Sequence, residues 1–173
     1  ISSRTCGRFS SADVEIEVHR PDDVDALADL WVDLASDQRR HGSHLSADAN
    51  RPHVRELIVR HVVTKTALLA RRGGVVVGFV TFEVESGRFR QDVTRGLIHN
   101  LFVRAPERGD GIGSALLTAA EEALDAGGAA VIALESMAEN DAARAFYRRH
   151  GYDPHRVELE KPINGDAVTT DDG

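Results

Sequence analysis

The feature that most constrains this chain is a glycine-rich turn between an apolar run and a helical pattern. The run from Leu97 to Val103 is largely apolar, which predicts a buried strand. The segment Arg108–Leu117, with the sequence RGDGIGSALL, follows shortly after it. Apolar residues then recur at helical spacing, at Ile112, Leu116, Leu117, Ala120 and Leu124. These residues predict a strand, a tight turn and a helix in direct succession.

The turn has the composition of an anion site. Gly109, Gly111 and Gly113 carry no Cβ, so a ligand can approach the backbone closely. The N–H groups at a helix start lack partners within the helix, and the helix dipole favours an anion there. Arg108 adds a positive charge that can pair with phosphate. A tight turn that needs glycine and binds nothing is the alternative interpretation.

The spacing of the glycines excludes two common phosphate-binding motifs. A dinucleotide fingerprint, G-x-G-x-x-G, fails because Ser114 or Leu116 stands where its third glycine belongs. A P-loop needs Gly-Lys-Ser/Thr at the helix start, and no lysine lies near.

The spacing Arg108-x-x-Gly111-x-Gly113 resembles the acyl-CoA pyrophosphate loop of the GNAT superfamily of N-acetyltransferases. A second block, Asn140-x-x-Ala143-x-x-Phe146-Tyr147 followed by Gly151-Tyr152, is similar to that family's other cofactor-side segment. The resemblance covers residues 14–161. It implies an α/β fold with a mixed, mostly antiparallel sheet, splayed between strands 4 and 5, and helices on both faces. The implied reaction moves an acetyl group from acetyl-CoA, as co-substrate, to a primary amine of a small molecule or peptide.

The resemblance also assigns the residues that hold the cofactor. The turn residues would surround the pyrophosphate, and the main chain near the end of the preceding strand would pair with the pantetheine arm. These cofactor-binding residues are Leu101, Phe102, Val103, Arg108, Gly109, Asp110, Gly111, Ile112, Gly113, Ser114 and Asn140. Asp110 stands where relatives often carry a basic or neutral residue, so its carboxylate must point away from the pyrophosphate.

Tyr147 is the candidate general acid. Asn140 is placed to cap a helix that ends with Arg148, Arg149, His150 and Gly151, and this explains the helix without any chemistry. Tyr147 shares a face with Ala143 and His150, and by resemblance its phenol would protonate the departing thiolate. A phenol suits this role because its ordinary pKa of ~10 keeps it protonated at neutral pH.

The sequence does not decide which residue is the general base that deprotonates the amine. His99 and Asn100 interrupt an otherwise apolar strand, and burying either without a partner costs roughly 1–3 kcal/mol. They form a hydrogen-bonded pair, or a bulge turns one outward, or the strand splays and His99 faces the acceptor amine. Relatives commonly place a carboxylate in this region. Glu135, at the end of the following strand, is the other candidate and would act through water.

Two further groups carry weaker signals. Glu83 and Glu85 share one strand face, which is solvated or meets a cationic amine. His41-x-x-His44 has no third or fourth partner at metal-ligand spacing, so we expect no metal.

Length and charge narrow the remaining function classes. A chain of 173 residues suits one enzyme domain, 14–161, between a leader, 1–13, and an acidic tail, 162–173. The net charge of -7 argues against nucleic acid, and no apolar run is long enough for a membrane span. A single cysteine, Cys6, suggests a cytoplasmic setting. A homodimer stays open. The alternative function is a non-catalytic acyl-CoA-binding sensor or scaffold.

The remaining elements follow from periodicity and turn residues. The sequence predicts a hairpin turning at Gly73-Gly74. It also predicts a polar connection, Ser36–Pro52, between the first two helices, and a last strand near Val157–Glu160. The other predicted strands are 14–19, 66–71, 75–85 and 130–134, and the other helices include 21–34, 54–62 and one from Asn140.

Overall fold

The computed structural model describes residues 14–86 and 92–163. The chain divides into two compact units, the first ending at Asn140 and the second beginning at Asp141, and each is described by itself. The predicted leader with Cys6, and the tail from Asn164 onward, lie outside the described residues.

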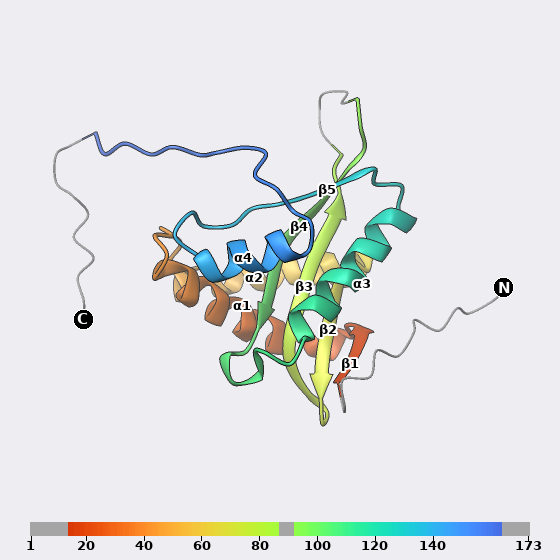
Figure 1. Ribbon diagram of the computed structural model, residues 1–173. Coiled ribbons are helices and arrows are strands. Elements are labelled where there is room, and N and C mark those ends of the chain that lie inside the picture. Colours follow the sequence, from red (N-terminus) through yellow and green to blue (C-terminus); the bar gives the residue numbers. More distant parts are fainter. Residues whose placement is uncertain (1–13, 87–91, 164–173) are drawn as a thin grey trace. The chain divides into compact units, whose positions relative to one another are not determined.

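The first unit is built on a five-stranded sheet with the order β1-β2-β3-β4-β5 (Figure 1). The strands are β1 (Val14–Val18), β2 (Ala67–Arg72), β3 (Val75–Val84), β4 (Arg95–Val103) and β5 (Val131–Leu134). The pairs from β1 to β4 are antiparallel, and β5 joins β4 in parallel. The β2–β3 turn uses Gly73 and Gly74, both with positive φ, at the position that the sequence predicts. The mixed, mostly antiparallel α/β fold is therefore confirmed.

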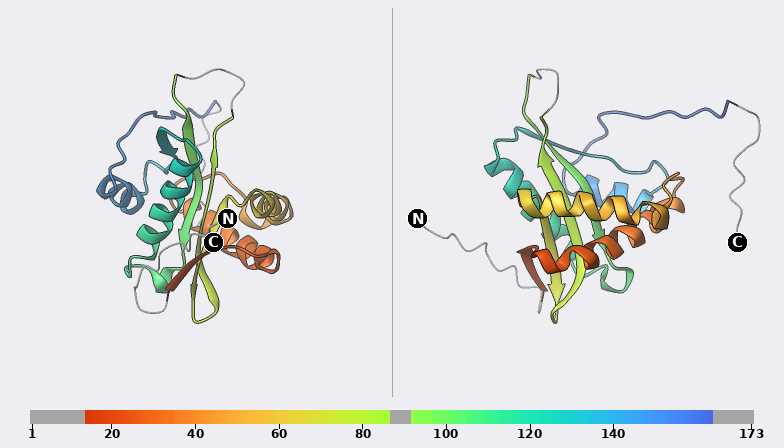
Figure 2. Two further views of the ribbon diagram at one scale, coloured as in Figure 1. Left: turned by 90° about the vertical axis from the view of Figure 1, so that its right-hand side faces the viewer. Right: turned by 180° about the vertical axis from the view of Figure 1, so that it is seen from behind.

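Helices cover both faces of this sheet, as Figure 2 shows. Helices α1 (Val24–Arg39) and α2 (Ala47–Thr64) lie on one face, where they pack with Phe79 and Phe102. Helix α3 (Ile112–Ala126) covers the other face. Its side chains at the predicted helical positions, Ile112, Leu116, Leu117, Ala120 and Leu124, are all buried. Short 3₁₀ turns, η1 (Pro21–Asp23) and η2 (Ala105–Glu107), precede α1 and α3.

Two boundaries differ from the sequence predictions. The polar connection is shorter than Ser36–Pro52, because α1 continues to Arg39 and α2 already begins at Ala47. Polar side chains on the outer faces of both helices concealed the helical pattern, and Pro52 lies inside α2, where its missing N–H removes one helical hydrogen bond without ending the helix. The predicted strand Val157–Glu160 is wrong. Val157 and Leu159 are exposed, and the segment pairs with no strand of the described residues.

The second unit contains α4 (Asp141–Arg149). Its aromatic side chains contact one another: the Tyr147 ring centroid lies 5.3 Å from that of Phe146 and 6.0 Å from that of Tyr152. Asn140 immediately precedes this helix, at the position that the sequence predicts for its cap.

Candidate functional site

The glycine-rich turn opens helix α3 in a way that only glycine tolerates easily. Gly109 and Gly111 have φ values of 96° and 79°, in the left-handed region. Gly111 is the N-cap of α3 and gives it no side-chain hydrogen bond, and Ile112 and Gly113 form the first turn. An added Cβ at Gly109 or Gly111 would meet nothing within 4 Å. The side of Gly109 and Gly111 on which a Cβ would stand is therefore open, which lets a ligand approach the backbone closely.

Strand β4 offers a free edge directly before this turn. Its ladder with β5 covers only Arg95–Ile98, so among the described residues no strand pairs with the edge beyond Ile98. The Arg104 N–H donates to the Val77 carbonyl on the β3 side. Because hydrogen-bonded pairs alternate in an antiparallel ladder, the Phe102 backbone also faces β3, whereas Leu101 and Val103 face the free edge. All four residues of β5 pair with β4, so the free edge arises where β5 ends, and the splay between the two strands stays a prediction.

Arg108 connects the turn to helix α1. Its Nε donates to the Val103 carbonyl at 2.8 Å, and its Nη2 lies 3.1 Å from the Asp37 carboxylate. Its guanidinium carbon is 5.3 Å from the Phe102 ring centroid, a cation–π distance. Asp37 was not singled out by sequence reasoning, because only the tertiary packing of α1 against β4 brings it to Arg108.

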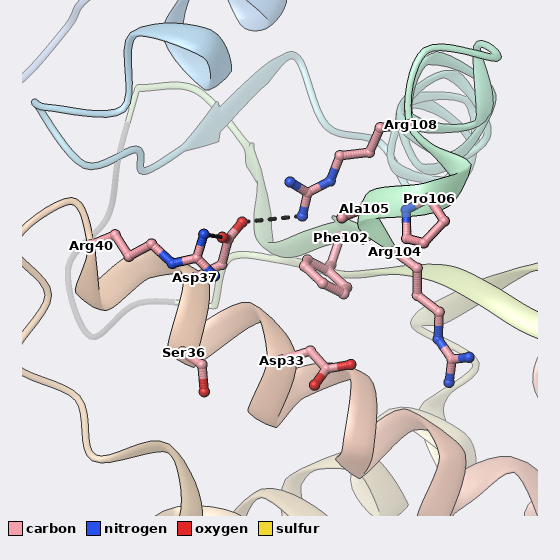
Figure 3. Close-up of a pocket in the computed structure, with 9 residues that line it drawn as sticks. All are labelled: Asp33, Ser36, Asp37, Arg40, Phe102, Arg104, Ala105, Pro106 and Arg108. Atoms are coloured by element: carbon pink, nitrogen blue, oxygen red, sulfur yellow. Dashed lines mark hydrogen bonds and ion pairs between the residues drawn. The ribbon is translucent and has the colours of Figure 1, made fainter. Parts of the chain in front are cut away.

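These side chains border a pocket of about 530 Å³ between α1 and the connection from β4 to α3 (Figure 3). Its floor includes the Phe102 ring, and its charged groups come from both walls. The lining residues are Asp33, Ser36, Asp37, Arg40, Phe102, Arg104, Ala105, Pro106 and Arg108. The pocket therefore combines an apolar surface with carboxylates and guanidinium groups next to the free edge of β4.

The carboxylate of Asp110 is paired within the first unit. Arg72 on β2 lies 3.0 Å from Asp110 and also pairs with Glu107. This bridge ties both acidic side chains of the turn to the sheet. The single Arg72 guanidinium thus offsets part of the charge of the two carboxylates beside the predicted anion site.

A β-bulge explains the polar pair His99-Asn100. Asn100 stands opposite Thr81 and Ile98 opposite Phe82, so His99 is the extra residue. Asn100 donates from Nδ2 to the buried Thr81 hydroxyl at 2.8 Å, while His99 is exposed, with its Nε2 3.0 Å from Glu83 Oε1. Asn100 is therefore satisfied by a hydrogen bond, and the bulge turns His99 outward. The bulge also lies where the β4–β5 ladder ends.

Glu135 directly follows Leu134, the β5 partner of Ile98. Glu135 therefore stands just past the end of the parallel ladder, and its side chain is exposed. The two candidate bases thus occupy the same end of the ladder, on neighbouring strands.

Helix α2 supplies a residue that sequence reasoning missed. The ring centroid of His61 lies 6.3 Å from that of His99. Burial lowers the pKa of His61 below its usual 6.5, and the nearby charges of His99, Arg60 and His19 lower it further, against an opposing effect of Glu83. No spacing in the sequence links His61 to His99, because they meet only through packing of α2 on the sheet.

Tyr147 lies on α4 in the second unit. Burial raises the pKa of its phenol to about 12. The hydroxyl is therefore protonated across the physiological pH range, which a proton donor requires.

The sequence matches the family model described as "Acetyltransferase (GNAT) family" over residues 24–152. The chain belongs to the GNAT family of acetyltransferases. The match begins at the start of α1 and extends past α4, so it includes the turn, the β4 edge and Tyr147. No curated protein matched this chain.

Solved structures agree with this fold. A GCN5-related N-acetyltransferase from Ralstonia eutropha JMP134 is 24% identical, with a TM-score of 0.69 over 87% of this chain and 98% of its own. PaiA N-acetyltransferase from Thermoplasma acidophilum, solved with coenzyme A, is 16% identical, with a TM-score of 0.70 over 84% and 92%. Naa50 from Arabidopsis thaliana, solved with the bisubstrate analogue CoA-Ac-MVNAL, is 21% identical, with a TM-score of 0.63 over 84% and 86%.

The described part of the chain offers neither a metal-ion cluster nor a membrane span. No group of three or more His, Cys, Asp or Glu side chains there is arranged to hold a metal ion. No helix there is long and apolar enough to cross a membrane.

Proposed function

We propose that this protein transfers an acetyl group from acetyl-CoA to a primary amine of a small molecule or peptide. One juxtaposition carries the proposal: the free edge of β4 leads directly into an α3 N-terminus that begins with left-handed glycines and lacks a side-chain cap. An extended amide-bearing arm suits the edge, and a phosphate suits the helix start. Acyl-CoA joins these two chemical groups in one molecule.

The residues present fit this co-substrate. Leu101 and Val103 would pair with the pantetheine amides, and the N–H groups of residues 111–114 would receive the pyrophosphate. Arg108 would exchange its Asp37 partner for a phosphate, and Asn140 would lie on the cofactor side, as the resemblance implies. Arg72 compensates the charge of Asp110 at this site. When bound, the co-substrate supplies an activated acetyl group as a thioester.

The chain itself would supply the proton transfers. An ammonium group cannot attack a carbonyl, so a base must first remove a proton. We assign this role to His99, whose bulge presents it on the sheet face covered by α1 and α2, with Glu135 as the alternative acting through water. The Tyr147 phenol would donate its proton to the departing sulfur. Backbone N–H groups at the splay would stabilise the developing oxyanion.

Two structures of similar proteins support the proposed co-substrate and the proposed acceptor. The Thermoplasma acidophilum protein was solved with coenzyme A, and the Arabidopsis thaliana protein with an analogue joining CoA to a peptide. Both acceptor classes, a small amine and a peptide N-terminus, therefore belong in the test. We further propose that the protein works in the cytoplasm, without nucleic acid or membrane as partners.

Release of free thiol tests the proposal against its alternative, a non-catalytic acyl-CoA-binding module. The protein is mixed with acetyl-CoA and a panel of small amines and short peptides, and thiol and acetylated amine are both quantified. We expect thiol release that depends on protein and amine and equals the acetylated product. Tight acetyl-CoA binding without thiol release for any acceptor would support the sensor or scaffold instead.

A further inference from the structure

Hydrogen bonds around the β4 bulge fix which ring nitrogens of two histidines carry protons. The first chain begins at the end of α2. Thr64 Oγ1 has one hydroxyl proton and three acceptors within reach: the Arg60 carbonyl at 2.9 Å, the His61 carbonyl at 3.4 Å and Thr66 Oγ1 at 2.7 Å. When the Thr64 proton goes to a backbone carbonyl, Thr66 Oγ1 donates to Thr64. His61 Nδ1 lies 2.8 Å from Thr66 Oγ1 and can then only donate to it. This direction of the chain gives His61 the Nδ1–H tautomer.

The second chain crosses from β3 to β4. An ionised Glu83 carboxylate can only accept, so His99 must carry a proton on Nε2, 3.0 Å from Glu83 Oε1. The unprotonated atom of neutral His99 is then Nδ1. Glu83 also offers a negative charge to an imidazolium that forms when Nδ1 takes a proton.

The groups around His61 and His99 determine which of the two imidazole rings carries the positive charge after protonation. His61 faces His99 on β4, Glu83 on β3, His19 after β1 and Arg60 on its own helix. His61 is more buried and contacts no carboxylate among residues 14–86 and 92–163, whereas His99 is exposed and contacts Glu83 directly. Two adjacent imidazolium ions would repel each other, so a neutral His61 leaves His99 free to be charged.

We propose that Glu83 and His61 are positioning residues for His99: Glu83 makes Nδ1 the atom that accepts the proton, and burial keeps His61 neutral beside it, with its ring held by the threonine chain. This inference rests on the proposed function, in which His99 deprotonates the acceptor amine. In the step, the amine N–H bond breaks, its electron pair stays on the nitrogen, and the proton joins His99 Nδ1. Glu83 stays ionised throughout.

Ring ¹⁵N NMR on the full chain tests the tautomers without substrate. We expect His61 as Nδ1–H and His99 as Nε2–H near neutral pH. Thr66→Val removes the acceptor at constant shape and should convert His61 toward Nε2–H, whereas Thr66→Ser should leave its tautomer unchanged. An Nε2–H signal for His61 in the parent protein, or no change in Thr66→Val, would overturn the arrangement.

The pH dependence of kcat/KM tests whether Glu83 positions His99 as the general base. Glu83→Gln should lower kcat/KM roughly tenfold or more, within the about 10²–10⁴-fold that a whole general base contributes. The acidic limb should move to lower pH, because the imidazolium loses its partner, and Glu83→Asp should restore part of both changes. Glu85→Gln is the matched control, since Glu85 pairs with Arg95 instead, and it should leave the profile unchanged.

The two experiments separate the inference from the proposed function. Turnover with an unshifted profile in Glu83→Gln would refute the inference and leave acetyl transfer intact. If no acceptor is acetylated, the tautomer measurement alone decides whether the bulge is built as described.

Discussion

Substituting Gly111 by alanine should separate the role of the turn in binding from its role in the fold. A non-glycine residue in the left-handed region costs about 1–2 kcal/mol. No atom lies within 4 Å of the new Cβ, so strain is the whole cost to the fold. For a chain of this length, that free energy lowers Tm by roughly 2–8 °C.

The same Cβ should also weaken acetyl-CoA binding. It would occupy the space through which a phosphate reaches the N–H groups at the start of α3. Losing one charge-assisted hydrogen bond costs about 1.5–3 kcal/mol, which corresponds to a Kd about 10- to 150-fold higher. Isothermal titration calorimetry with acetyl-CoA on the folded variant measures this directly.

Gly128→Ala is the matched control. Gly128 has φ 88° and also meets nothing within 4 Å, but it follows the other end of α3. It should lose a similar amount of stability without a change in Kd. Equal affinity in Gly111→Ala and Gly128→Ala would refute the assignment of the turn.

Three further perturbations have defined outcomes. Tyr147→Phe should lower kcat by about 10²–10⁴-fold with little change in acetyl-CoA affinity, and full kcat in steady-state assays would return Tyr147 to a packing role. Asp37→Asn frees Arg108, so titration calorimetry should show acetyl-CoA binding tightened by up to about fivefold, the usual limit for an exposed ion pair; weakened binding would contradict this. Because folded His61 has a lowered pKa, the unfolded chain binds more protons as pH falls below 6.5, and stability should fall there. Urea titrations should show a smaller loss in His61→Gln, and an identical loss would exclude His61 as the cause.

Much of the fold could be predicted because its signals are local. The helix α3 pattern, the Gly73-Gly74 turn and the glycine-rich turn each depend on residues adjacent in sequence. The strand predicted at Val157–Glu160 failed because alternation alone does not supply a pairing partner.

The sequence predicted only those parts of the site that lie within one continuous segment of the chain. The turn from Arg108 and the polar pair at His99 could be found in the sequence, since they interrupt an apolar strand or open a helix. The partners of these residues could not. Asp37 reaches Arg108 and His61 approaches His99 only through the packing of α1 and α2 on the sheet. Which residues become these partners depends on the tertiary structure, and the local spacing of residues does not predict it.

Residue-resolved amide hydrogen exchange with acetyl-CoA tests the proposed binding site most directly. Without ligand, the Phe102 amide should already be protected by the β3 ladder, while the Leu101 and Val103 amides at the free edge exchange faster. Saturating acetyl-CoA should slow exchange at Leu101 and Val103, and at Ile112 and Gly113 in the first turn of α3, and leave Phe102 unchanged. Unaltered exchange at these four amides under saturating acetyl-CoA would contradict the proposed site.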